Sequence, residues 1–358
     1  MNIRTQNLNS NINNLQILKN INASFNNEGI NVLIGPNGAG KTSLLRQVTL
    51  LDRPTSGEIF YEDRPVSRMS SDEKTLFRRK IGFVFQTPLM LSGTVFDNIT
   101  YGLKIRGIVI NKNKVEETLL KIGLSDKSYH NAKELSGGEK QRLSIARVLI
   151  IEPEVFIFDE PTVNLDPLSV KTIEDIISGL AGLRKTIILS THNLRQAIKY
   201  GSKISFMKDG EILQEGDFKE IFNRPAMLDV AEYLYSKNII YGNILKEDGQ
   251  TYLIRDDLKI VVVAGNISGE VAGILSPEDI FVSKTRLDSS ARNCFRGTIK
   301  NIEWLGSVYI LTVCVNKVCF ETVITKQSLI SMNLKIGDEI FITFKATSVH
   351  ILKSPLYP

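Results

Sequence analysis

The 358-residue sequence predicts an α/β domain built on a parallel sheet, followed by a smaller all-β region. Through about the first 225 residues, short apolar segments alternate with segments of helical periodicity, which is the pattern of a parallel sheet covered by helices. From Ile239 onward, short strand-like segments are separated by turn signals such as the pair Asp248 and Gly249, which is typical of small barrels. The expected organisation is a first domain over residues 1–228, a β segment over 239–287 and a second β segment over 288–358.

Each predicted strand of the first domain is short and apolar. Residues 30–34 lead into a glycine-rich loop, and residues 42–51 continue as a helix with apolar residues at helical spacing. Residues 155–158 (VFIF) show no polar alternation, as expected for a central strand that is covered on both faces. The pattern over residues 95–151 is helical, so we expect an inserted helical lobe there. Further strands are predicted at residues 81–85 and 186–189, with a hairpin over 204–213 that turns at Asp209 and Gly210.

Residues 35–42 read GPNGAGKT and fit the phosphate-binding pattern G-x-x-x-x-G-K-[ST]. Glycines are needed because backbone N–H groups must converge on phosphate oxygens without side chains in the way. In this pattern Lys41 reaches the β- and γ-phosphates, and Thr42 reaches a Mg²⁺ ion. The nucleotide-contacting residues predicted in this segment are Gly35, Pro36, Asn37, Gly38, Ala39, Gly40, Lys41, Thr42 and Ser43.

A second glycine-rich loop lies about a hundred residues further on, where residues 135–142 read LSGGEKQR. It opens a predicted helix over about residues 139–150. The start of a helix presents free N–H groups and the positive end of the helix dipole, both of which favour an anion. Ser136, Gly137 and Gly138 are therefore further candidates for contact with a nucleotide.

Two carboxylates, Asp159 and Glu160, follow the apolar strand at residues 155–158. Asp159 is placed to hold Mg²⁺, directly or through water. Glu160 is then the natural candidate to polarise the attacking water. The alternative is that the two acids merely end a strand before a turn at Pro161. Because a phosphate-binding loop lies upstream, we favour the catalytic interpretation over this alternative.

Together these motifs resemble those of the ATP-binding cassette (ABC) ATPases, and the resemblance covers about the first 225 residues. It implies a P-loop NTPase fold, with a RecA-like core and an inserted helical subdomain, that binds and hydrolyses ATP with Mg²⁺. It also implies that Gln86 touches Mg²⁺ and the water, and that His192 senses the γ-phosphate. The expected catalytic residues are thus Glu160, His192 and Gln86, and the expected Mg²⁺ ligands are Thr42, Gln86 and Asp159.

The same resemblance implies a homodimer. In the ABC ATPases the second glycine-rich loop, here residues 136–138, caps a γ-phosphate that is bound to the partner chain. Two chains then close over two ATP molecules about a two-fold axis, so each site is built from both protomers. Residues 164–166 (NLD) match the loop that crosses this interface.

The last seventy or so residues resemble the molybdate- and tungstate-binding Mop module of the wider TOBE class of small, OB-like β domains. The matching segments read SARNCF at residues 290–295, ITKQS at 324–328 and FKATSV at 344–349. Such modules bind tetrahedral oxyanions between two small barrels, where a dianion is held by convergent donors and a cation. The alternative is a purely structural dimerisation barrel. The resemblance offers as oxyanion ligands Ser290, Arg292, Asn293, Thr325, Ser328 and Lys345.

These resemblances imply the ATP-hydrolysing subunit of an importer, most directly one for molybdate or tungstate. Such a subunit works as a homodimer beneath two transmembrane permease subunits, at the cytoplasmic face of the membrane, and is fed indirectly by an external solute-binding protein. Anion bound to the C-terminal β segment, residues 288–358 (the tail), would inhibit the ATPase by feedback. The alternatives are an importer for sulfate, ferric iron, sugar or polyamine with a structural tail, a soluble ABC protein acting on DNA or ribosomes, and an oxyanion sensor or store.

Composition narrows these alternatives. The net charge of +5 is mild and not gathered in a basic stripe, so we expect no nucleic-acid partner. No run of 18 apolar residues is present, and the first residues lack the apolar region of a secretory signal. Cys294, Cys314 and Cys319 have no metal-binding spacing and are expected to be buried strand thiols in a reducing cytosol.

One feature of the ABC ATPases is missing from this sequence. They usually stack adenine on an aromatic residue upstream of the phosphate-binding loop, but the corresponding residues 12–15 (INNL) contain none. Because stacking on a base is worth about 1–3 kcal/mol, we predict weak ATP binding and poor discrimination against GTP. The variant Asn13→Tyr should tighten ATP binding about 5- to 100-fold, as measured by titration with both nucleotides. Equally tight binding of ATP to the wild type and the variant would contradict this prediction.

Overall fold

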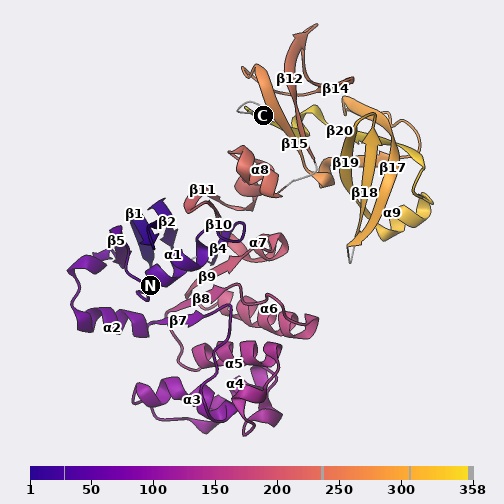
Figure 1. The fold of residues 1–358 in the computed structure, drawn as a ribbon. Helices are drawn as coiled ribbons and strands as arrows, with labels where there is room; N and C mark the ends of the chain where they lie inside the picture. Colours follow the sequence, from indigo (N-terminus) through magenta and orange to yellow (C-terminus); the bar gives the residue numbers. More distant parts are fainter. Residues whose placement is uncertain (28, 235–237, 306–307, 354–358) are drawn as a thin grey trace. The chain divides into compact units, whose positions relative to one another are not determined.

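The computed structural model describes all residues of the chain except 28, 235–237, 306–307 and 354–358 (Figure 1). It divides into two compact units, Met1–Phe218 and Lys219–Pro358. The first unit thus ends at Phe218, before residue 228, where the sequence analysis placed the end of the first domain. The segment after Phe218 packs with the second unit, where the ring nitrogen Nε2 of His350 donates to the carbonyl oxygen of Pro225 at 3.0 Å.

The first unit contains a six-stranded sheet in the order β11-β10-β4-β9-β8-β7. Five of its strands are parallel, and β11 is antiparallel to β10. The strand that leads into the phosphate-binding loop, β4, is fully buried between β10 and β9. The predicted strands and the hairpin turn at Asp209 and Gly210 are confirmed. The strands are β4 (Ile30–Ile34), β7 (Ile81–Val84), β8 (Val155–Asp159), β9 (Thr186–Thr191), β10 (Gly201–Lys208) and β11 (Glu211–Gly216).

A second, antiparallel sheet in the first unit has the order β2-β1-β5-β6, with β3 paired to β1. Helix α1 (Lys41–Val48) packs between the two sheets, because its Leu44 and Leu45 belong to one core with Leu8 of β1 and Leu33 of β4. The Tyr61 hydroxyl donates to the carbonyl oxygen of Val48 at 2.7 Å and ties β5 to the end of α1. These strands are β1 (Ile3–Ile12), β2 (Leu15–Ile21), β3 (Ser24–Phe25), β5 (Ser56–Tyr61) and β6 (Arg64–Pro65).

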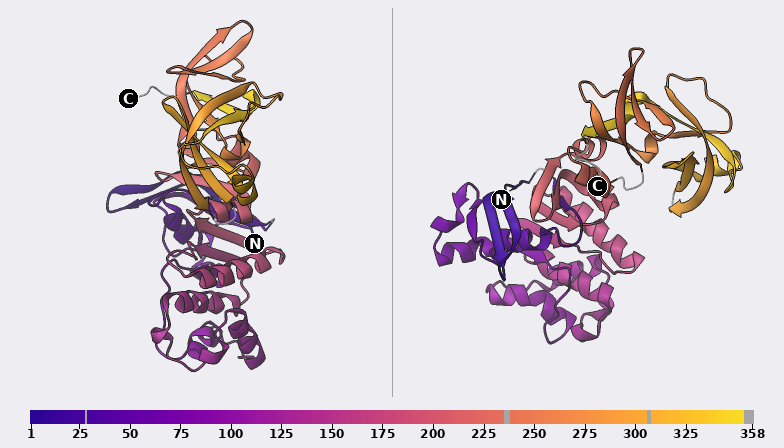
Figure 2. Two further views of the ribbon diagram at one scale, coloured as in Figure 1. Left: turned by 90° about the vertical axis from the view of Figure 1, so that its right-hand side faces the viewer. Right: turned by 45° about the horizontal axis from the view of Figure 1, so that its top comes forward.

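The helical lobe that the sequence predicts is present (Figures 1 and 2). It has its own hydrophobic core. Ile99 of α3, Leu119 of α4 and Leu143 of α5 meet in this core. Side chains start all three helices, because Thr94, Asn111 and Ser136 each accept a hydrogen bond from a backbone N–H group of the first turn. The helices of the first unit, beyond α1, are α2 (Ser71–Arg79), α3 (Val95–Ile105), α4 (Lys112–Lys121), α5 (Gly137–Leu149), α6 (Pro167–Ala181) and α7 (Leu194–Tyr200).

In its described residues, the second unit contains two five-stranded antiparallel sheets, the short helices α8 and α9, and a π-helical segment at Lys219–Asn223. One sheet has the order β14-β13-β12-β15-β21, and the other β16-β20-β17-β18-β19. Its elements are α8 (Leu228–Leu234), β12 (Ile239–Glu247), β13 (Gln250–Arg255), β14 (Leu258–Val261), β15 (Gly269–Leu275), β16 (Phe281–Ser283), β17 (Asn293–Leu305), β18 (Val308–Val315), β19 (Val318–Thr325), α9 (Lys326–Ser331), β20 (Glu339–Phe344) and β21 (Val349–Lys353).

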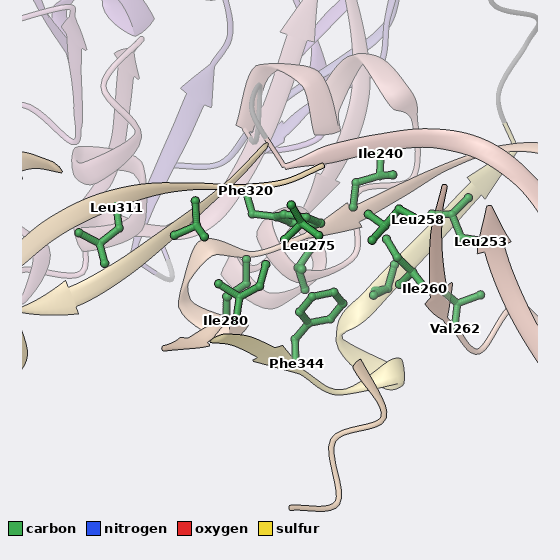
Figure 3. Close-up of a cluster of buried hydrophobic side chains, with 14 of the residues drawn as sticks. Ile240, Leu253, Leu258, Ile260, Val262, Leu275, Ile280, Leu311, Phe320 and Phe344 are labelled. Carbon is green, nitrogen blue, oxygen red and sulfur yellow. The ribbon is translucent and has the colours of Figure 1, made fainter. Parts of the chain in front are cut away.

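The two β segments that we expected to be separate share one hydrophobic core (Figure 3). Leu253 and Ile260 of the first sheet lie in the same cluster as Phe320 and Phe344 of the second. The final strand, β21, also leaves the second segment and pairs with β15 of the first. Residues 239–287 and 288–353 therefore form one folding unit.

The expectation of three buried thiols is wrong. Cys314 and Cys319 are directly opposite each other on β18 and β19 and form a disulfide. Cys319 is exposed, and Cys314 and the free Cys294 are half-buried. Strand periodicity does not distinguish this arrangement from buried thiols, because the pairing depends on the register across the hairpin.

Asn293 ties the two sheets of the second unit together. Its side chain is 1% exposed, and its Oδ1 accepts from the backbone N–H of Val261 at 2.8 Å while its Nδ2 donates to the Val261 carbonyl oxygen at 2.9 Å. Because Asn293→Ala leaves both backbone groups without these partners, we predict a loss of about 1–3 kcal/mol in the free energy of unfolding. The measurement is urea unfolding followed by the fluorescence of Trp304, the only tryptophan in the chain.

The matched control is Asn301→Ala, which removes an exposed amide from the same strand and should change the free energy by less than about 0.5 kcal/mol. Equal urea midpoints for the two variants would contradict a structural role for Asn293.

Candidate active site

The phosphate-binding loop connects β4 to α1 and requires glycine at particular positions. At Gly35, where φ is 155°, a Cβ atom would lie 2.0 Å from the carbonyl oxygen of Met207. Gly38 and Gly40 have φ values of 82° and 99°, in the region that favours glycine. The N–H group of Gly210 donates to the carbonyl oxygen of Ala39 at 3.1 Å, so the β10–β11 turn supports the loop.

Lys41 lies folded back into this loop. Its ammonium group donates to the carbonyl oxygens of Gly35 and Pro36 at 2.9 and 3.0 Å. It also lies 3.3 Å from the Glu160 carboxylate, with both side chains less than a tenth exposed. A buried ion pair persists where further hydrogen bonds satisfy its members, as the two carbonyl oxygens do here. The Lys41 ammonium group therefore lies among three oxygen-bearing groups, one of which is the carboxylate of the candidate base.

Asp159 ends β8 and is 2% exposed. Thr42 Oγ1 donates to its Oδ2 at 2.8 Å, and the Ser190 hydroxyl donates to its Oδ1. Burial raises the pKa of Asp159, and the neighbouring Glu160 charge adds to this effect; the bonds from Ser190 and Thr42 and the charge of Lys41 oppose it. Two adjacent carboxylates beside one lysine leave an excess of negative charge that suits a cation.

The donor set fits Mg²⁺. The Thr42 hydroxyl, the Asp159 carboxylate and the Gln86 amide offer hard oxygen atoms, and Mg²⁺ in nucleotide sites typically takes few protein ligands because phosphates and waters supply the rest. Among the residues that the structure describes, no three His, Cys, Asp or Glu side chains form an all-protein metal cage.

Glu160 is the point at which the other predicted residues meet. Its Oε2 lies 3.2 Å from His192 Nδ1, and Gln86 Nε2 donates to the same oxygen at 3.3 Å. These partners follow β9 and β7, and Glu160 follows β8, because the carboxyl ends of parallel strands lie at one edge of the sheet. The backbone of Glu160 has a φ of 45°, in the left-handed region, and its N–H donates to Ser190 Oγ at 3.0 Å. The side chains of Lys41, Gln86 and His192 thus converge on Glu160.

The second glycine-rich loop is placed differently. Ser136 caps α5 by accepting from the Glu139 N–H, and Glu139 bonds back to the Ser136 N–H. Gly138 lies against the N-terminus of α6, where a Cβ atom on it would be 2.3 Å from Ser169 Oγ and 2.7 Å from Asp166 Oδ2. Among the described hydrogen bonds and ion pairs, none joins residues 136–138 to the phosphate-binding loop or to Glu160.

Two polar residues of this site were missed by the sequence analysis. Ser190, which contacts Asp159 and the backbone of Glu160, precedes Thr191 and His192 at the end of β9 and could have been found from that position. Gln141 is 1% exposed and donates to the carbonyl oxygen of Phe85, next to Gln86, at 3.2 Å. No local signal distinguishes Gln141 from the solvent-facing residues of α5.

The segment expected to meet adenine is the turn between β1 and β2. Asn13 and Asn14 have φ values of 49° and 66°, as in a two-residue hairpin turn. The flanking Ile12 and Leu15 are 49% and 66% exposed. Strand β2 reaches the phosphate-binding loop, because a Cβ atom on Gly40 would lie 3.1 Å from the carbonyl oxygen of Ile17.

The six oxyanion candidates do not converge within one chain. Arg292 and Lys345 are exposed and flank the paired residues Asn293 and Phe344 of β17 and β20; Ser290 is exposed just before β17. Thr325 lies opposite Val308, near the other end of β17, and its hydroxyl caps α9 and lies 2.9 Å from Ser328 Oγ. The prediction for Asn293 is wrong for its side chain, because the buried amide is already bonded to Val261.

The fold and this site define a P-loop ATPase of the α/β class, in which lysine, threonine and acidic side chains meet at the carboxyl edge of a parallel sheet. The sequence matches the ABC transporter family over residues 18–163 and the TOBE domain over residues 289–351. It is 32% identical over 327 residues to the molybdate/tungstate import ATP-binding protein WtpC of Pyrococcus horikoshii, covering 89% of this chain and 91% of that protein. The chain therefore belongs to the ATP-binding subunits of ABC transporters and is an ATPase.

Other relatives share the ATPase but differ in their named solutes. The phosphate import ATP-binding protein PstB of Borreliella burgdorferi is 39% identical over 247 residues, covering 66% of this chain and 94% of that protein. ATP-binding proteins for spermidine/putrescine and Fe³⁺ import are also similar. Among solved structures, a dimeric ATP-binding cassette in a post-hydrolysis state with ADP and Pi matches with a TM-score of 0.54 and 30% identity, covering 60% of this chain and 98% of that one. No helix in the described part of the chain is long and apolar enough to cross a membrane.

The contact at Gly138 gives a prediction about stability. Gly138→Ala places a methyl group against Asp166 and Ser169, and overpacking of this kind costs about 1–3 kcal/mol. Thermal unfolding of the first unit should shift downward by about 2–4 °C for each kcal/mol. Gly137→Ala is the matched control, because a Cβ atom at Gly137 has nothing within 4 Å. If both variants unfold at the wild-type temperature, α5 does not pack on α6 as described.

Proposed function

We propose that this chain is the ATP-hydrolysing subunit of an importer for a tetrahedral oxyanion, most directly molybdate or tungstate. The observation that carries the proposal is a match that includes the β tail at the higher identity. Two molybdate/tungstate import proteins are 32% and 33% identical over 89% of this chain. The spermidine/putrescine and Fe³⁺ import proteins cover 94% of it at 31% and 28% identity, and the phosphate import protein covers 66%. The second candidate is an importer for another solute, such as phosphate, polyamine, ferric iron, sulfate or sugar, with a structural tail, and similar proteins named for the first three support it.

The proposed chemistry is in-line attack of water on the γ-phosphate of ATP. The backbone N–H groups of residues 35–40 and the Lys41 ammonium bind the phosphates, and Ser43 lies in the first turn of α1 behind them. Bound Mg²⁺ would be held by Thr42, Asp159 and Gln86 and would neutralise charge on the β- and γ-phosphates. The phosphates draw Lys41 away from Glu160, and the freed carboxylate then accepts a hydrogen bond from the attacking water. His192, 3.2 Å from that carboxylate, contacts the γ-phosphate.

Each site is proposed to be completed by a second copy of the chain. Residues 136–138 lie exposed or against α6, at the N-terminus of α5, where free N–H groups and the helix dipole favour an anion. With no hydrogen bond to the phosphate-binding loop of their own chain among the described contacts, they serve the ATP of the partner, and residues 164–166 lie at the same interface. The dimeric state of a similar cassette supports this arrangement.

In the assembled importer, the homodimer would lie at the cytoplasmic face of the membrane beneath two transmembrane permease subunits, which receive the solute from an external binding protein. No nucleic acid takes part. Alternate closure over ATP and opening after hydrolysis then drive the permease subunits between two states.

The tail is proposed to sense the transported anion. Arg292 and Lys345 provide positive charge at one end of β17, and Thr325 and Ser328 provide hydroxyl groups near the other. Two tails placed side by side would bring such groups together around a dianion, together with Ser290. Because the coupling between two sites is reciprocal, anion that stabilises an open arrangement of the cassettes lowers the affinity for ATP.

The anion proposal is tested by calorimetric titration of the full chain with tungstate, molybdate, sulfate and phosphate. We expect micromolar or tighter binding of tungstate and molybdate, and a loss of at least tenfold in Lys345→Ala. The matched control is Lys335→Ala, another exposed lysine of the same unit, which should bind as the wild type does. Absence of binding to any of the four anions would overturn the sensing role and favour a structural tail.

Feedback is tested separately in the assembled transporter. Millimolar molybdate or tungstate should lower its ATPase rate, and Lys345→Ala should remove this inhibition while leaving the uninhibited rate unchanged. An ATPase rate indifferent to both anions would rule out feedback, whatever the importer's solute.

A further inference from the structure

We propose that Gln196 is a positioning residue for ATP hydrolysis, because its side chain joins the segment that carries Glu160 to the segment that carries His192. The inference rests on the roles proposed above for Glu160 and His192. Nothing in the motifs of the sequence marks Gln196, which lies in the first turn of α7, away from the phosphate-binding loop.

The side-chain amide of Gln196 spans the two segments directly. It is 3% exposed, and its Oε1 accepts a hydrogen bond from Thr191 Oγ1 at 2.9 Å. Its Nε2 donates to Thr162 Oγ1 at 2.9 Å. Thr191 immediately precedes His192, and Thr162 follows Glu160 by two positions. One buried amide therefore fixes the distance between the two segments whose side chains meet at Glu160 Oε2 and His192 Nδ1, 3.2 Å apart.

The orientation of this amide is determined by a third contact. Nε2 also donates to Glu174 Oε1 on α6 at 3.2 Å, and an ionised carboxylate can only accept. The amide nitrogen must therefore face Glu174 and Thr162, which leaves Oε1 for Thr191. Lys199 holds the other oxygen of Glu174 at 2.8 Å. Both N–H groups and the carbonyl oxygen of Gln196 are thus satisfied, which is the condition for a buried polar group to rigidify its surroundings.

Such a connection matters because the backbone at Glu160 is held in an unfavourable conformation. A non-glycine residue with a φ of 45° persists only where its surroundings impose it. Glu160 N–H donates to Ser190 on one side, and the bond from Gln196 to Thr162 restrains the chain on the other. Removing that restraint leaves the P-loop contacts intact but frees the carboxylate to shift. Because displacement of a catalytic group by about 1 Å can cost up to about 100-fold in rate, the effect falls on kcat rather than on KM.

The first test is Gln196→Met, which keeps the length of the side chain and removes its hydrogen bonds. In the purified full chain, and in the assembled transporter, kcat for ATP hydrolysis should fall about 10- to 100-fold while KM for ATP changes less than about twofold. The matched control is Lys199→Met, which removes the other partner of Glu174 and contacts neither Thr162 nor Thr191, and should leave kcat within about twofold.

An exchange of two side chains separates positioning from general loss of stability. Gln196→Glu places a second carboxylate beside Glu174 where the amide now donates at 3.2 Å, so kcat should fall as in Gln196→Met. The double variant Gln196→Glu with Glu174→Gln restores an amide facing a carboxylate. Thr191 and Thr162 can still donate to the new carboxylate, because a hydroxyl both donates and accepts. The double variant should therefore recover kcat to within about threefold of the wild type.

A wild-type kcat in Gln196→Met or in Gln196→Glu would overturn the inference, as would a double variant no more active than Gln196→Glu. The rate of ATP hydrolysis by Glu160→Gln, measured in the same assay, distinguishes a failure of the Gln196 inference from a failure of the role proposed for Glu160. If Glu160→Gln hydrolyses ATP at the wild-type rate, the role of Glu160 fails; if it is inactive and the Gln196 variants are not, only the positioning role fails.

Discussion

The site depends on the buried ion pair between Lys41 and Glu160, whose charged atoms lie 3.3 Å apart. This pair brings the loop after β4 against the end of β8, and Gln86 and His192 then contact the same carboxylate from the ends of β7 and β9. Asp159, which precedes Glu160, is also buried, and its pKa is raised mainly by that burial. One lysine beside two carboxylates leaves an excess of negative charge around Asp159 and Glu160, which a divalent cation would offset.

The topology explains why residues so far apart in sequence share one carboxylate. Parallel strands present their carboxyl ends at one edge of the sheet, and β4 lies between β10 and β9 with β8 and β7 beyond. Two further contacts support the site. The β10–β11 turn bonds to Ala39 of the phosphate-binding loop, and Gly138 of the helical lobe packs on the start of α6. Helix α6 thus lies against the helical lobe, where Ser169 is next to Gly138, and is joined through Glu174 and Gln196 to Thr162 in the segment after Glu160.

Features set by local sequence were predictable. Apolar segments predicted the strands, and glycine spacing predicted the phosphate-binding loop, because both signals depend on residues that are neighbours in the sequence. The ends of the predicted strands then located Asp159, Glu160 and His192. Features set by distant partners were not. Asn293 has the chemistry of a ligand, but its partner is Val261 in a different strand, and the pairing of Cys314 with Cys319 depends on the hairpin register. Gln196 lies in a turn of helix with no motif, and only the fold places Thr162 and Thr191 on either side of its amide.

Two copies of this chain are proposed to complete each other's ATP sites. The most direct measurement is the mass of the Glu160→Gln chain in solution, by light scattering after size exclusion, with and without ATP and Mg²⁺. Because this variant should bind ATP without hydrolysing it, we expect the mass of one 40.1 kDa chain in buffer without nucleotide or oxyanion, and of two chains after ATP and Mg²⁺ are added. A second variant, Ser136→Phe in the same background, should abolish the dimer by blocking the start of α5. A mass that stays at one chain under saturating ATP would contradict the claim.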